Sequence, residues 1–160
     1  MIRGLHHNAY RCRNSEETRT FYEGFLGLPL ADAFPIQTTK TGRETDVLHS
    51  FYRLDDGSFL AFFEAPDRPF EFKDQHDFDL HIALEVSMED LHAMFEKGKS
   101  LGYNPRGISD HGFIHSIYFR DPNGYVIELT AKVPGKSKDP AEAEKEAHEI
   151  LGNWAARHAS

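Results

Sequence analysis

Cysteine and long apolar runs are nearly absent from this 160-residue chain. Its single cysteine, Cys12, excludes an internal disulfide framework. The first residues, MIRGLHHNAYRC, contain no apolar run of the length that a signal peptide or a membrane span requires. We therefore expect a cytoplasmic protein whose fold depends on a buried core and not on covalent cross-links.

Basic residues are also in short supply. The chain has 18 Lys and Arg against 26 Asp and Glu, which gives a formal net charge of −8. Because nucleic acids and anionic membranes reward clustered positive charge, we expect neither as a partner. Ten histidines and 13 phenylalanines are present instead, and they suit an apolar cavity that contains metal ligands.

The stretch HSIYFRDPNGYVIELTA, residues 115–131, predicts two short strands joined by a tight turn. Polar and apolar residues alternate in the first strand, and Asn123-Gly124 tolerates the positive φ of such a turn. The second strand carries one carboxylate, Glu128, among apolar residues. Burying an unpaired carboxylate costs several kcal/mol, so this strand predicts a partner or a metal ion for Glu128.

An imperfect copy of this hairpin occurs earlier, in LHSFYRLDDGSFLAFFEA, residues 48–65. The motif HSFY at His49 repeats HSIY at His115, and each is followed by an acidic turn and an apolar strand. Such self-similarity indicates a duplicated unit. When the turns are aligned on their glycines, Ala61 occupies the position of Glu128.

Each half of the chain predicts the order β-α-β-β-β. The two first strands are expected at Leu5 to Cys12, which contains His7, and at FDLHIALEV, which contains His81. The helices that follow are capped by Asn14 or Ser15 and by Ser87. The expected modules are residues 1–66 and 77–133, with a charged, proline-containing linker between them. Within the first module, residues 31–44 predict a short strand and a mobile loop over the site.

Residues 134–160 differ from the rest in periodicity. A polar linker leads to Asp139-Pro140, which is typical of a helix start, and apolar residues then recur at helical spacing up to Trp154. We expect an amphipathic C-terminal helix that packs on its own domain or on a second subunit. This helix favours a homodimer.

The two units resemble the vicinal oxygen chelate superfamily, which includes glyoxalases, bleomycin and fosfomycin resistance proteins, epimerases and extradiol ring-cleaving dioxygenases. The resemblance rests on H-x-A at His7, on FYEGFLGL and on YFRDPNGYVIEL, and covers residues 2–132. It implies an α+β fold in which two βαβββ modules curl a mixed sheet around a metal cleft, here followed by the C-terminal helix. Residues 1–133 form this domain.

The superfamily places its metal ligands at positions occupied here by His7, His81, Ala61 and Glu128. Ala61 offers no ligand, which leaves two histidines and one carboxylate, a set suited to Fe(II) with open positions; Mn, Zn and Ni are alternatives. His6 competes with His7, which strand alternation favours. Glu64 competes as a fourth ligand, but a regular strand places it on the opposite face from Ala61.

Three more residues favour the dioxygenase branch. Tyr118 lies ten residues before Glu128, in a pattern similar to the active-site tyrosine that precedes the carboxylate ligand in those enzymes. His49 is similar to their acid-base histidine, and His111 is a further candidate. The resemblance implies chelation of a small catecholic aromatic and its cleavage by O2. A glyoxalase-like metal-dependent lyase or isomerase and a module that binds aromatic drugs remain the alternatives.

Overall fold

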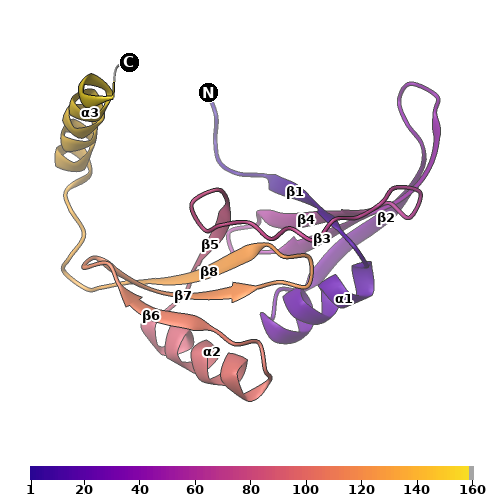
Figure 1. Cartoon of the computed structure of the whole chain (residues 1–160), viewed down its shortest axis with the longest axis horizontal. Helices are drawn as coiled ribbons and strands as arrows, with labels where there is room; N and C mark the ends of the chain where they lie inside the picture. The colour runs from indigo at the N-terminus through magenta and orange to yellow at the C-terminus, as the bar shows by residue number, and fades with distance from the viewer. Residues whose placement is uncertain (159–160) are drawn as a thin grey trace.

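The computed structural model describes residues 1–158 and shows two modules with the same order of elements (Figure 1). The first module contains β1 (His7–Cys12), α1 (Ser15–Arg19), the π-helical η1 (Thr20–Phe25), β2 (Leu30–Thr38), β3 (Glu44–Arg53) and β4 (Phe59–Glu64). The second contains β5 (His81–Glu85), α2 (Met88–Ser100), β6 (Arg106–Asp110), β7 (Ile114–Arg120) and β8 (Val126–Lys132). The helix α3 (Pro140–Arg157) follows.

Each module forms a four-stranded mixed sheet. The strand orders are β1-β4-β3-β2 and β5-β8-β7-β6, and in both sheets only the first pair of strands is parallel. The registers match as well, since His7 lies opposite Phe59 and His81 lies opposite Val126. Phe59 and Val126 each follow the glycine of the preceding turn by two residues. The predicted duplication and α+β class are therefore confirmed.

The predicted helix starts are confirmed by their caps. The side chain of Asn14 accepts hydrogen bonds from the backbone N–H groups of Glu16 and Glu17. Ser87 accepts one from Asp90, and Asp139 caps α3 ahead of Pro140. These side chains satisfy N–H groups that have no partner within a helix, so each helix begins where its cap stands.

The two modules share one hydrophobic core. Phe25 of η1 stacks on Tyr103 with ring centroids 4.2 Å apart and meets the edge of Phe119. The inward faces of both sheets and both helices supply the remainder, which includes Phe21, Tyr22, Tyr52, Leu60, Phe62, Leu91, Ile117, Ile127 and Leu129. Because the core-facing sides of both sheets are used in this way, their opposite faces are left for a site.

The turn after β7 also joins the modules. Asp121 is 3% exposed, and its carboxylate accepts hydrogen bonds from the backbone N–H groups of Asn123 and Tyr125 and from the Tyr22 hydroxyl of the first module. Burial and the nearby Asp121 charge raise the pKa of Tyr22 well above its usual value, so this hydroxyl stays a donor. Gly124, at φ +99°, lies against the backbone of Lys73, where a Cβ would clash.

The prediction for residues 31–44 was right about a strand and wrong about its length. β2 is a nine-residue strand, and with β3 it forms a long hairpin that projects from the body (Figure 1). Its turn, residues 39–43, is closed by hydrogen bonds between Thr39 and Arg43. Threonine-rich sequence suits a strand as well as a loop, and pairing with β3 decides between them.

The C-terminal helix forms as predicted but buries no side chain. Ile150, Leu151 and Trp154 are each more than half exposed, and α3 stands apart from both sheets (Figure 1). Of the two expected positions, packing on its own domain is not seen in residues 1–158, and packing on a second subunit stays a prediction. Within residues 1–158, no helix has both the length and the apolar character to cross a membrane.

Candidate metal centre

Four predicted residues gather on the outward face of the second sheet. Glu128, on the central strand β8, is 8% exposed at its side chain, and its Oε2 lies 3.2 Å from Nε2 of His81. Tyr118, paired with Glu128 across β7 and β8, donates its O–H to Oε1 at 3.2 Å. The Tyr118 oxygen lies 3.2 Å from Nε2 of His111, which therefore acts as its donor. The structure thus places His81, Glu128, Tyr118 and His111 in one connected group.

The backbone fixes which nitrogen of His81 faces Glu128. Nδ1 of His81 lies 2.7 Å from the carbonyl oxygen of Asp77, which can only accept, so Nδ1 carries the proton. In the neutral imidazole, Nε2 then presents a lone pair to a carboxylate oxygen. Two electron-pair donors at this separation fit a shared cation, and a backbone partner on the far nitrogen is usual for a metal-binding histidine. The donor set therefore fits half of a divalent metal site.

The neighbours of Tyr118 in this group affect the pKa of its phenol. Burial and the charge of Glu128 raise the pKa of the Tyr118 phenol, so it remains a hydrogen-bond donor at neutral pH. The guanidinium of Arg106 lies over its ring, 5.2 Å from the centroid, and also pairs with Asp77. The sequence did not predict that Asp77 orients His81, because the contact is made by the backbone carbonyl of Asp77 and every residue type has such a carbonyl.

His7 lies on the other sheet, at the exposed start of β1. Its Nδ1 is 2.8 Å from Nδ1 of His6, and its ring centroid is 6.2 Å from that of His49. In residues 1–158, no three His, Cys, Asp or Glu side chains are close enough to hold one metal ion. His7 therefore does not join His81 and Glu128 within one chain.

His49 lies on the same outward face as His7, on β3. Its ring stacks on Phe63 at 3.7 Å and packs against Phe51, and its Nδ1 donates to the carbonyl of Phe62 at 3.0 Å. This hydrogen bond leaves the lone pair on Nε2. An imidazole held in this form, 6% exposed among aromatic rings, can accept a proton from a ligand on that face.

Aligning the motif HSFY on HSIY differs by one residue from the alignment that the strand pairing gives. His49 pairs with Phe63, and the equivalent residue of the second module is Ser116, paired with Thr130. His115 instead matches Leu48 and lies on the opposite face, 3.5 Å from Asp110. Because side chains alternate along a strand, His49 and His115 point in opposite directions.

Glu64 lies on the core-facing side of β4, where its register with β1 and β3 is unbroken. Its carboxylate accepts a hydrogen bond of 2.7 Å from the backbone N–H of Ser15 at the start of α1. The expected opposite face is confirmed, and this carboxylate has a structural partner. Ala61 is buried between Ala9 and Phe51 and supplies no donor.

Paired βαβββ modules, each with a four-stranded mixed sheet, define the class of fold to which this chain belongs. The family model of the Glyoxalase/Bleomycin resistance protein/Dioxygenase superfamily matches residues 4–129, and the chain belongs to this superfamily. A comparison with curated protein sequences gives no match.

Solved structures share the fold at low identity. A fosfomycin resistance protein, FosX, from Listeria monocytogenes, complexed with Mn(II) and sulfate, is 20% identical, with a TM-score of 0.62 over 85% of this chain and 98% of its own. A glyoxylase/bleomycin resistance protein/dioxygenase domain from Frankia sp. EAN1pec is 17% identical, with a TM-score of 0.65 over 83% and 100%. A glyoxalase/dioxygenase from Nostoc punctiforme is 19% identical, with a TM-score of 0.62 over 82% and 92%.

Proposed function

We propose that the chain is a metal-dependent oxidoreductase that cleaves the ring of a small catecholic aromatic with O2, as extradiol dioxygenases do. The observation that carries the proposal is the Glu128 group: a buried carboxylate shared by an oriented histidine and a tyrosine that is itself held by His111. The absence of a donor at Ala61 supports it, because two histidines and one carboxylate leave positions open for substrate and O2.

The metal would be held by His7, His81 and Glu128. Fe(II) is our first choice, with Mn, Zn and Ni as alternatives, and when bound it would supply the Lewis-acid centre at which both substrate oxygens and O2 meet. His81 is pre-oriented for this role by Asp77, and Glu128 by Tyr118. These contacts hold both donors in place before any ion arrives.

We further propose that the third ligand is His7 of the partner subunit in a homodimer. His81 and Glu128 gain no third ligand within residues 1–158, whereas a two-fold axis that brings the first sheet of one chain against the second sheet of another would form two identical sites. The exposed apolar face of α3 supports an assembly, since Ile150, Leu151 and Trp154 lack cover in one chain.

In such a dimer, His49 would enter the site together with His7. Its bare Nε2 would accept a proton from a substrate hydroxyl, and the rings of Phe51 and Phe63 would hold an aromatic substrate beside it. When the Tyr118 hydroxyl gives up its hydrogen bond to Glu128, it would donate one to a substrate oxygen instead. His111 keeps the Tyr118 oxygen in position for that exchange.

A metal-dependent lyase or isomerase of the glyoxalase kind is the second candidate. The same His and Glu donors suit Zn, Ni or Mn as a Lewis acid, and FosX in the comparison above holds Mn(II) in the same fold. In this case Glu128 would serve as ligand and base.

Metal analysis and a catechol assay test the proposal. We expect iron after anaerobic purification, and we expect the iron-loaded protein to convert a member of a catechol panel in O2 to a yellow ring-opened product. Turnover of a hemithioacetal with Zn or Ni, with no catechol cleaved, would replace the dioxygenase with the lyase. If the protein binds aromatic compounds but no metal, it is a binding module.

A further inference from the structure

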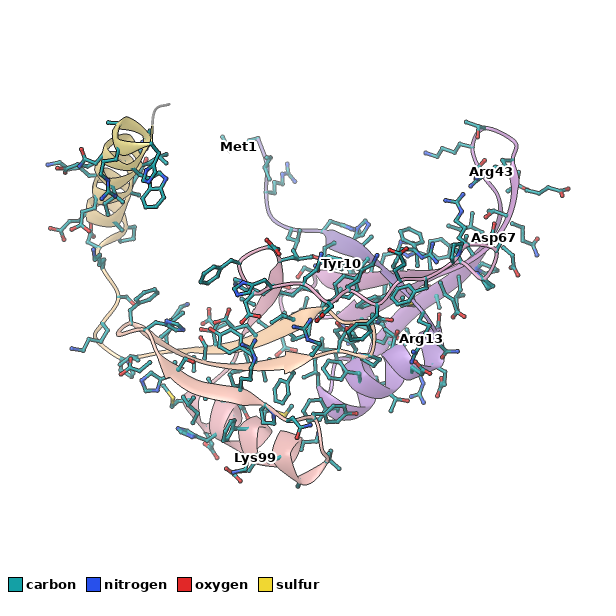
Figure 2. The ribbon with its side chains drawn as sticks, viewed as in Figure 1. Met1, Tyr10, Arg13, Arg43, Asp67 and Lys99 are labelled. Carbon is teal, nitrogen blue, oxygen red and sulfur yellow. The ribbon has the colours of Figure 1, made fainter. Side chains whose placement is uncertain are left out.

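A cavity lies on the outward face of the first sheet, at the projecting end of the β2–β3 hairpin. Its volume is about 300 Å³, and its walls include three arginines, Arg11, Arg43 and Arg68, together with Thr45 and Phe63. The arginines come from β1, the hairpin turn and the loop after β4. Segments distant in sequence thus place three positive charges around one small space. Arg43 lies at the projecting end of the hairpin (Figure 2).

These three arginines form no ion pair within the described part of the chain, residues 1–158. Asp67 lies at the same end of the molecule in Figure 2, but it pairs with none of them and does not line the cavity. A guanidinium presents a fork of donors that matches the oxygens of a carboxylate or a phosphate.

Two polar atoms beside the cavity are buried without a partner. Nε of Arg11 has none in residues 1–158, although a terminal nitrogen of the same guanidinium donates to the carbonyls of Ala65 and Arg68 at 3.3 and 3.4 Å. The Thr45 hydroxyl is buried and unpaired in the same way. Buried donors are normally satisfied, so two of them at one cavity indicate a missing acceptor.

The cavity adjoins His49 through Phe63. The ring of Phe63 lines the cavity and also stacks on His49, and Arg11 is the register partner of Phe63 on β1. An apolar group lying against Phe63 would therefore reach His49 at one end and the arginines at the other.

We propose that this cavity is an oxyanion subsite, which binds the carboxylate or phosphate group of a ligand whose apolar part lies against Phe63. Arg43 and Arg68 supply the charge, and Arg11 and Thr45 supply the buried donors. The link to substrate turnover rests on the proposed function, whereas binding of the anion does not.

The test is calorimetric titration of the full-length protein with benzoate, phenyl phosphate and, as the neutral analogue, benzyl alcohol. We expect the two anions to bind and benzyl alcohol to bind far more weakly. Arg43→Gln and Arg68→Gln should each weaken anion binding about 10- to 100-fold, because a hydrogen bond to a charged group is lost. Lys40→Gln removes a charge from the same hairpin turn, outside the cavity lining, and should have little effect.

The same titration on Glu128→Ala separates this subsite from the metal centre. Anion binding that survives this substitution supports the subsite even if the proposed enzyme activity fails. A stronger response to phenyl phosphate than to benzoate would assign a tetrahedral anion, and the reverse a planar carboxylate. Equal binding of benzyl alcohol, or an equal loss in Lys40→Gln, would overturn the proposal.

Discussion

Replacing Glu128 by alanine is expected to abolish metal binding, with a loss of affinity larger than the roughly 10- to 100-fold that follows removal of a supporting residue. Glu128 is the carboxylate of the site, and its Oε2 faces the bare Nε2 of His81. His81→Ala should have the same effect. Metal content after dialysis against a weak chelator, measured by mass spectrometry, checks both variants.

Glu64→Ala is the matched control for that result. Both glutamates lie on the last strand of their module, but Glu64 faces the core and accepts from Ser15 N–H. We expect this variant to keep its metal and to lose about 1.5–3 kcal/mol of unfolding free energy, the contribution of a hydrogen bond to a charged group. Loss of metal from Glu64→Ala would show that the site uses four ligands.

His49→Phe is expected to lower catechol turnover about 10²- to 10⁴-fold while metal content stays unchanged. The phenyl ring can retain the stacking on Phe63, so the substitution removes the proton acceptor and the hydrogen bond to the Phe62 carbonyl. Steady-state rates measured on protein with verified iron content check this prediction.

His115→Phe is the control, because this histidine begins the similar motif HSIY but lies on the opposite face. Its turnover should stay near that of the unaltered protein. If His49→Phe releases the metal, His49 is a ligand or a support for one, and the acid-base role is wrong.

Much of the fold could be predicted because it depends on local signals. Caps such as Asn14 and Ser87 act within one helical turn, and the turn glycines Gly57 and Gly124 align the two modules. The length of the strand in residues 31–44 could not be predicted in this way, because it depends on the pairing of β2 with β3.

The site was predictable only in part. Strand alternation placed Glu64 correctly on the far side from Ala61, and the position of Tyr118 opposite Glu128 agrees with their spacing in a hairpin. The likeness of HSFY to HSIY misaligned His49 by one residue, since similar letters do not fix a register. The orientation of His81 depends on a carbonyl oxygen in the linker, which the sequence does not encode as a residue type.

The proposed homodimer, in which His7 of one subunit completes the metal site of the other, is tested most directly by one measurement. His7→Ala and Glu128→Ala are purified, mixed in equal amounts under conditions that let subunits exchange, and analysed for metal. If His7 acts across the dimer, each variant alone is empty, but half of the randomly formed dimers regain one intact site, giving about one metal ion for every four chains. A mixture as empty as its two parents would contradict a shared site.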